Sequence, residues 1–249
     1  MKLSVVIPSY NSQAWLPHAV ASIFGLPGNK NLQGQTHKDL ELIIVNDGST
    51  DNTFQYLEWL SAQHSRDVLK IVNLGQNKGR SAARNLGNDV ATGELILVLD
   101  ADDIAAPNRA ALTIKKYQES KADFLYGSAS IIDGQGDVIG TLRAGPFNRE
   151  LAIKEMTNRI VHSTVAYTKD FAKKYPYRGQ QIPEIDRLGI DDWDLAIRAS
   201  FGGAKMDFVP QTISAYRAIM SGISAGRDED AAHAAKLKIL EEMKEPVSI

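Results

Sequence analysis

The chain contains 249 residues, of which 43% are hydrophobic and 23% charged, and its formal net charge at pH 7 is −2. Because no dense run of lysine and arginine accompanies this near-neutral charge, we expect no nucleic acid partner. The absence of cysteine excludes a disulfide framework, a thiolate zinc site and a thiol nucleophile.

Strand and helix patterns alternate through the first half of the chain. Apolar runs rich in valine, isoleucine and leucine, typical of strands buried on both faces, occupy residues 3–7, 40–45 and 95–99. Segments with helical spacing occupy residues 15–24, 53–63, 81–90 and 107–119. This alternation predicts an α/β fold with a doubly wound, mostly parallel sheet.

Polar residues follow each of the three apolar runs, at positions 8–11, 46–49 and 100–103. Ligands of doubly wound sheets bind outside the carboxyl ends of the strands, so we expect these segments to meet in one polar crevice.

The pattern changes beyond residue 121. Shorter strands at 124–132 and 138–142, separated by an Asp-Gly turn at 133–136, predict a β-hairpin. The polar segment 26–38 predicts a surface loop, and the alanine-rich, charged stretch 229–244 predicts a helix packed against the domain or a partner.

The N-terminal apolar run is short, rich in β-branched residues and interrupted by Pro8, which does not fit a signal peptide or a membrane span. No later segment reaches about 18 uninterrupted apolar residues. We therefore expect a soluble, cytoplasmic protein, with peripheral association at the inner membrane face left open.

Asp100, Asp102 and Asp103 place three carboxylates directly after a buried strand. Their mutual repulsion is costly unless a cation neutralises it. Hard oxygen ligands favour Mg²⁺ or Mn²⁺, which also share the phosphate oxygens of a substrate. A solvated acidic start of a helix is the alternative interpretation.

Two further segments suit a nucleotide. Asp47 follows a buried strand, where its carboxylate can accept an N–H from a nucleobase, whereas Asp51 is better explained as a cap of the following turn and helix. Lys78, Arg80 and Arg84 lie near a helix start that favours anions, and of the three we assign only Arg84 to a diphosphate.

A second acidic cluster opens a helix at residue 191. Helix capping accounts for Asp191, and Asp194 with Arg198 has the spacing of an ordinary helix ion pair. Asp192 has no such structural explanation. We therefore predict that Asp192 is a general base that removes a proton from an acceptor hydroxyl.

Five segments occur in the order seen in the inverting family 2 glycosyltransferases, which this chain resembles over roughly residues 3–224: SVVIPSYN, VNDGSTDNT, NKGRSAARNLG, LVLDADDIAAP and IDDWDLAIRA. The resemblance implies the GT-A fold, a UDP-sugar or related nucleotide-diphosphate donor, and Mn²⁺ or Mg²⁺ as cofactor. It also implies transfer to a glycan or lipid-linked acceptor in polysaccharide, glycolipid or cell-surface glycan synthesis.

Carried over by position, the resemblance implies a metal ligand at Asp102, a catalytic base at Asp192, and a nucleotide-sugar site of Pro8, Tyr10, Asn11, Asp47, Arg84, Asp100, Ala101 and Asp103. We expect a single domain with a nucleotide-sugar-binding half (1–120), an acceptor-binding half that carries the base (121–224) and a C-terminal helical tail (225–249). Whether it forms a homodimer is left open.

Two departures from the family pattern stand out. The segment 26–35 is longer than the usual loop and could cover the nucleotide or mediate contacts. Ile219 stands where the family's YRxH pattern has a histidine, after Tyr216 and Arg217.

Other classes fit less well. A nucleotidyltransferase would carry a glycine-rich basic loop at residues 8–11, and a dehydrogenase would carry G-x-G-x-x-G there. A catalytically silent scaffold that binds sugar nucleotides is the main alternative, and the presence of Asp102 and Asp192 argues against it.

Overall fold

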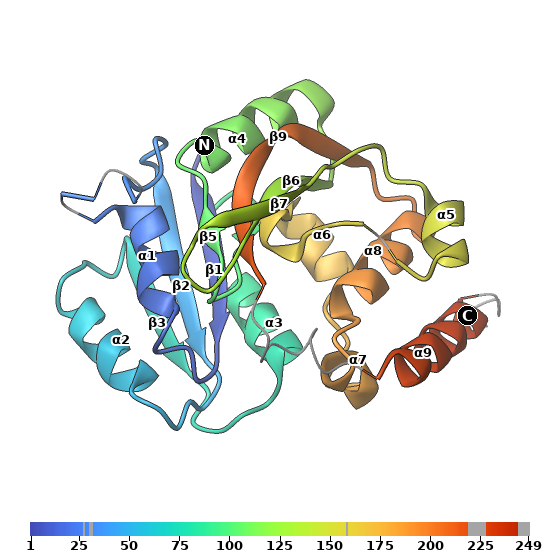
Figure 1. Cartoon of the computed structure of the whole chain (residues 1–249), viewed down its shortest axis with the longest axis horizontal. Coiled ribbons are helices and arrows are strands. Elements are labelled where there is room, and N and C mark those ends of the chain that lie inside the picture. The colour runs from blue at the N-terminus through green and yellow to red at the C-terminus, as the bar shows by residue number, and fades with distance from the viewer. Residues whose placement is uncertain (27, 30–31, 158, 219–227, 244–249) are drawn as a thin grey trace.

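A nine-stranded sheet runs through the computed structural model, which describes residues 1–26, 28–29, 32–157, 159–218 and 228–243 (Figure 1). The strand order is β3-β2-β1-β4-β8-β6-β9-β5, and β7 pairs with β6 beside this path. In Figure 1 the N-terminal elements lie on the left and the C-terminal helices on the right.

The first half contains, in chain order, β1 (Leu3–Ser9), α1 (Leu16–Phe24), β2 (Leu40–Asn46), α2 (Thr53–Ser61), β3 (Leu69–Asn73), α3 (Arg80–Val90), β4 (Leu95–Val98), β5 (Ile104–Ala105) and α4 (Arg109–Ser120). Strands β1 to β4 pair in parallel with one another, which confirms the predicted parallel sheet. The sequence pattern does not predict β3, because Lys70 interrupts its apolar run; in the structure β3 pairs in parallel with β2.

The second half contains β6 (Phe124–Ile132), β7 (Val138–Leu142), α5 (Arg149–Lys154), the 3₁₀ helix η1 (His162–Thr164), β8 (Ala166–Thr168), α6 (Lys169–Lys174), α7 (Pro183–Arg187), α8 (Asp191–Phe201), β9 (Met206–Arg217) and α9 (Glu229–Glu242). The predicted hairpin is confirmed, and Asp133 Oδ1 closes its turn by accepting from the amides of Gln135 and Asp137 at 2.8 and 3.0 Å. β8 joins the halves by running antiparallel to both β4 and β6.

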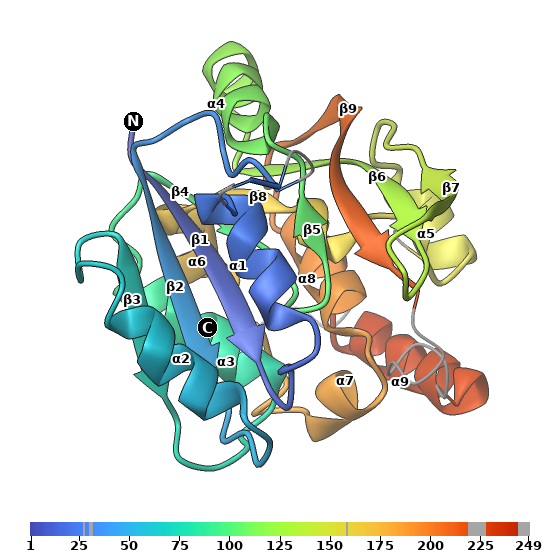
Figure 2. The same ribbon diagram turned by 60° about the vertical axis from the view of Figure 1, so that its left-hand side comes forward.

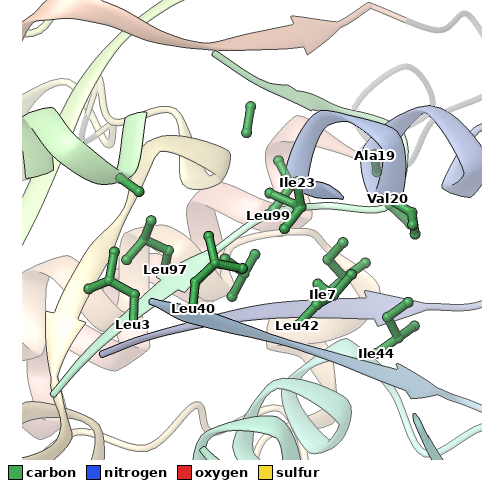
Figure 3. Packing of buried hydrophobic residues seen from close by; sticks show 14 of the residues in the cluster. Leu3, Ile7, Ala19, Val20, Ile23, Leu40, Leu42, Ile44, Leu97 and Leu99 are labelled. Atoms are coloured by element: carbon green, nitrogen blue, oxygen red, sulfur yellow. The ribbon is translucent and has the colours of Figure 1, made fainter. Parts of the chain in front are cut away.

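Helices cover both faces of the parallel strands, as Figure 2 shows for α1 in front and α3 behind. Alternate side chains of β2 point to opposite faces. Leu42 and Ile44 pack with α1 and α2, whereas Ile43 and Val45 pack with α3 and α8. Figure 3 shows the first of these two cores, where Ile23 of α1 lies beside Leu99, and Leu3 of β1 lies near Leu40 and Leu97. The predicted burial of these strands on both faces is therefore confirmed.

The segment 26–38 contains no helix or strand in its described residues, but the expectation of a surface loop is wrong for residues 32, 34 and 35. Leu32 and Gln35 are buried. The Gln35 side chain donates to the carbonyls of Ser22 and Ala106 at 3.0 and 2.9 Å and accepts from the amide of Ala110. Because the segment precedes β2, it lies at the amino ends of the strands, away from the expected nucleotide crevice (Figure 1).

The predicted C-terminal helix is confirmed as α9, which packs against the domain. Its apolar side chains lie in one cluster with Ile185 of α7 and Trp193 of α8. Within the described part of the chain, no helix is both long and apolar enough to cross a membrane.

Candidate active site

The carboxyl ends of β1, β2 and β4 lie at one edge of the sheet, so the three predicted polar segments meet as expected. Gly48 permits the close approach of two loops at this edge. Its φ is +70°, and a Cβ atom there would lie 2.4 Å from the backbone of Gln76. A side chain at position 48 would therefore push the loop before α3 away from β2.

Asp47 holds that same loop. Its buried carboxylate accepts hydrogen bonds from the amides of Lys78 and Gly79 at 2.6 and 3.0 Å. Burial raises the pKa of Asp47 despite these bonds, and the charge of Asp186 adds to the rise. The structure thus assigns Asp47 a positioning role, while its contact with a nucleobase stays a prediction.

Tyr10 and Asn11 follow β1 at the crevice. The Tyr10 side chain is 46% exposed, which leaves its ring available to a ligand. Asn11 has a φ of +49°, and its Oδ1 atom accepts from the amide of Thr50 at 2.8 Å. Asp51 accepts from the amides of Thr53 and Gln13, so its predicted role in capping the turn is confirmed.

Arg84 bridges the two halves of the chain. Its guanidinium donates to Asp100 at 2.6 Å and to Asp191, which lies 107 residues further along the chain. Arg84 is 3% exposed and lies over the ring of Tyr177, 5.4 Å from its centroid. In this structure its charge is therefore directed at two protein carboxylates, and the assignment of Arg84 to a diphosphate stays a prediction.

The start of α3 also has a protein carboxylate as partner. Asp186 of α7 accepts hydrogen bonds from the amide of Ser81, at 3.0 Å, and from its hydroxyl. Arg80 donates to the backbone carbonyl of Asp186 at 2.6 Å. The anion-binding position that the sequence suggests for a diphosphate is thus filled by Asp186, a residue that no sequence signal had pointed to.

The three predicted metal-site carboxylates differ in ionisation. Burial would raise the pKa of Asp100, but the Arg84 charge lowers it to about 2. Burial, and then the charge of Asp100, raises the pKa of Asp102 to about 6. Burial and the neighbouring aspartates also raise the pKa of Asp103.

Asp102 is the member of this cluster that fits a metal ion. Among the residues that the structure describes, no three acidic or histidine side chains are arranged to hold a metal. Asp100 is ion-paired with Arg84, and Asp103 accepts from the amide of Arg217 at 2.8 Å. The Asp102 carboxylate is partly exposed. Its pKa is raised by burial and by the negative charge of Asp100, and a hard cation bound to Asp102 would offset that charge. This carboxylate fits a single protein ligand to a metal that a substrate phosphate also binds.

Two buried polar residues support this loop: Ser163, which the sequence did not indicate, and Arg217 of the YRxH pattern. Ser163 of η1 accepts from the amide of Asp100 at 3.0 Å. Arg217, at the end of β9, donates to the backbone carbonyl of Asp102 at 3.0 Å and lies over the ring of Trp15. Ala101 is buried between its two acidic neighbours. Ile219 lies outside the described residues.

Asp191 and Asp192 open α8 side by side with opposite surroundings. The prediction that Asp191 caps the helix is wrong, because Ile190 is the N-cap and the Asp191 side chain pairs with Arg84 and Arg80. Those cations lower the pKa of Asp191 against the effect of burial. Asp192 is partly exposed, and burial and then the charge of Asp191 raise its pKa to about 6. The predicted Asp194–Arg198 ion pair is confirmed at 2.9 Å.

Asp192 lines a pocket of about 420 Å³ together with Ile190 and Trp193. Its Oδ1 accepts from the amide of Trp193 at 2.7 Å, and this bond orients the carboxylate at the start of α8. A carboxylate with a raised pKa in a pocket is suited to accept a proton near neutral pH.

Comparison with known proteins gives this arrangement a context. Residues 4–175 match the family model described as Glycosyl transferase family 2. An uncharacterized glycosyltransferase of Nostoc, alr2836, is 34% identical over 139 residues, which cover 56% of this chain and 40% of that protein. Glycosyltransferase GlyG of Streptococcus pneumoniae is 32% identical over 159 residues, covering 63% of this chain and 49% of GlyG.

A third relative has a more detailed name, UDP-Glc:alpha-D-GlcNAc-diphosphoundecaprenol beta-1,3-glucosyltransferase WfgD of Escherichia coli, and it is 29% identical over 137 residues. That alignment covers 55% of this chain and 49% of WfgD, so this chain spans about half the length of these relatives or less.

Among solved structures, S. aureus TarS 1-349 in complex with UDP-GlcNAc aligns with a TM-score of 0.66 at 18% identity. The alignment covers 98% of this chain and 71% of that one. The complex of the same protein with UDP aligns with a TM-score of 0.65 at 20% identity, over 98% and 70% of the two chains. These likenesses establish a shared fold, which confirms the GT-A architecture.

Proposed function

The chain belongs to glycosyl transferase family 2, and we propose that it transfers a sugar from a UDP-sugar to an acceptor hydroxyl, with inversion at the anomeric carbon. The observation that carries the proposal is that each half of the chain contains one partly exposed carboxylate with a raised pKa, Asp102 in the first half and Asp192 in the second. Arg84 forms ion pairs with Asp100, two residues before Asp102, and with Asp191, directly before Asp192.

The donor side is supported by the exposed ring of Tyr10 beside the polar strand ends. TarS, which shares the fold, has been solved with UDP and with UDP-GlcNAc. WfgD is named for transfer from UDP-glucose to a diphosphoundecaprenol-linked acceptor. We propose a UDP-sugar for this chain by analogy, and a glycan or lipid-linked acceptor.

In the proposed reaction Asp192 takes the proton from the acceptor hydroxyl as its oxygen forms a bond to the anomeric carbon. The bond from that carbon to the diphosphate oxygen breaks on the opposite face, so the configuration inverts and no covalent enzyme intermediate forms. Asp102 would hold Mn²⁺ or Mg²⁺, which when bound supplies charge stabilisation for the departing diphosphate.

The proposal is tested by thermal unfolding with UDP, GDP, CMP and dTDP, each with and without Mn²⁺ or Mg²⁺. We expect one nucleoside diphosphate with metal to raise the unfolding midpoint by about 5–10 °C at a ligand concentration near 100 times Kd. In Asp102→Ala, the part of this rise in the unfolding midpoint that depends on the metal should be lost. Asp137→Ala, a matched change at an exposed position of the β6–β7 turn, should keep it.

The possible results separate the candidate functions. If no nucleotide raises the unfolding midpoint, with or without metal, the transferase proposal is contradicted. Nucleotide binding without hydrolysis or transfer across a broad acceptor panel would favour the silent scaffold that binds sugar nucleotides.

A further inference from the structure

Helix α9 forms one wall of the pocket that contains Asp192. Glu229, Asp230, His233 and Lys236 line the pocket from this helix. The positions 229, 233 and 236 are spaced by three and four residues, so they share one face of the helix. Asp192 lies in the wall contributed by the start of α8.

The wall is held in place by packing beneath it. Ala232, Ile239 and Leu240 of α9 are buried in one apolar cluster with Ile185 of α7 and Trp193 of α8. Because α9 buries these side chains on the same domain that carries Asp192, its polar face has a defined position beside that carboxylate.

Lys236 adds a second anchor for the helix. It is 6% exposed, its Nζ atom donates to the carbonyl of Met156 at 2.5 Å, and its ammonium lies 5.5 Å from the centroid of the Trp193 ring. This cation is therefore engaged with the wall of the pocket.

The charges around the pocket are mostly negative. Four carboxylates line it, Glu155, Asp192, Glu229 and Asp230, against one lysine and one histidine. The Glu155 carboxylate is paired with the exposed Arg159 at 2.7 Å. An anionic group placed here meets like charges, whereas sugar hydroxyls can donate hydrogen bonds to the carboxylates.

We propose that this pocket is the acceptor subsite, and that Glu229 and Asp230 at the start of α9 make it selective for an uncharged glycosyl unit over a phosphate- or carboxylate-bearing one. The inference rests on the proposed transferase function. A volume of about 420 Å³ lies within the range of pockets that bind small ligands.

The test follows the ring C–H resonances of His233 by NMR in the full chain with UDP present. The ligands are methyl glycosides and their matched uronic acid and 6-phosphate forms, and His233→Gln assigns the resonance. We expect the neutral glycosides to shift the His233 resonance saturably, with a Kd at least about tenfold lower than the Kd of the matched anions. Asp230→Lys should reduce the ratio of the anion Kd to the neutral-glycoside Kd, because it replaces a negative charge of the pocket lining by a positive one.

Glu241→Lys is the matched control, because it makes the same charge change at an exposed position of α9 outside the pocket lining, and it should keep the ratio. Equal binding of neutral and anionic forms, equal effects of the two variants, or binding of UDP without any glycoside effect on His233 would overturn the inference. Failure of UDP to bind at all would instead contradict the proposed function, and is read separately from the thermal shift.

Discussion

Glu41 at the amino end of β2 and Asp102 after the carboxyl end of β4 are carboxylates beside the same parallel strands, but their surroundings have opposite effects on ionisation. Glu41 is fully buried, accepts from Ser4 at 2.7 Å and from Thr92, and is ion-paired with Lys70 at 2.8 Å. These partners overcome burial and lower its pKa to about 2.

Asp102 has the reverse balance, since burial and a like charge raise its pKa to about 6. Asp192, joined to this edge through Asp191 and Arg84, behaves in the same way. At the amino end of the strands, protein donors and a lysine stabilise the charge of Glu41. At the carboxyl end, Asp102 and Asp192 lack such partners for their full charge in the described ranges of the chain, and a bound cation or a proton would neutralise them. The contrast separates carboxylates that stabilise the fold from those available for chemistry.

The largest expected effect comes from removing the proposed base. Asp192→Asn should lower the transfer rate by about 10²–10⁴-fold, because the acceptor hydroxyl loses its proton acceptor. Steady-state assays at saturating donor measure this loss, and nucleotide binding should persist. Asp137→Asn serves as the exposed control. Transfer at the wild-type rate in Asp192→Asn would exclude Asp192 as the base.

Arg84→Met removes the cation shared by the two halves. Asp100 and Asp191 would then be left as buried charges without their main partner, so we expect a loss of about 3–5 kcal/mol in the free energy of unfolding. Urea denaturation measures it. Arg159→Met removes an exposed ion pair and should cost less than about 1 kcal/mol. Similar losses in both variants would show that the bridge does not stabilise the protein.

Glu41→Gln tests the other end of the sheet. We expect a loss of about 1–3 kcal/mol at pH 7, because buried donors lose a charged acceptor. Since folding lowers the Glu41 pKa from about 4.5 to about 2, its stabilisation is complete above pH 4.5 and is lost as pH falls towards 2. Urea denaturation across this pH range should show wild type and variant converging, whereas exposed Glu58→Gln should change little.

The pH profile of transfer provides a smaller contrast. A general base must be deprotonated, so with a pKa of about 6 for Asp192 the rate should rise through pH 6 and level off above it. At pH 5 we expect a rate about tenfold below the plateau. The rates are measured across pH at saturating donor and metal. The residual activity of Asp192→Asn should not show the rise through pH 6.

Tyr10→Ala should have the smallest effect. The exposed ring contributes little to stability, but loss of a base stacked on it would cost about 0.5–1.5 kcal/mol of binding free energy, or about two- to twelvefold in nucleotide affinity. Calorimetric titration with the nucleotide measures the change, and Tyr10→Phe should retain most of the affinity. An equal loss in both variants would indicate that the hydroxyl, not the ring, contacts the donor.

The parallel part of the fold was predictable because burial on both faces gives β1, β2 and β4 continuous apolar runs. The rest lacked such a signal. β8 has only three residues, and β9 contains Pro210 and shifts register against β6 near Ser128. Their place in the sheet depends on pairing with distant strands.

The sequence was sufficient to predict which loops carry the site residues, but not which side chains those residues contact. The positions of Asp47, Asp102 and Asp192 followed from where strands end and a helix begins. The bond between Arg84 and Asp191 did not, because an ion pair across 107 residues leaves no local spacing to read. The same reason hid Asp186, whose contacts lie 105 residues away at Ser81.

The Arg84–Asp191 contact also bears on the order in which the protein is assembled. Synthesis proceeds from the N-terminus, so Arg84 leaves the ribosome before Asp191 has been made. Strands β1 to β4 can pack with α1 and α2 during that interval, while the α3 side of the sheet still lacks the side chains of α8 and the guanidinium stays hydrated. Arg84 becomes closed from water only when Asp191 and α8 are in place, so the first half of the chain alone cannot complete the site.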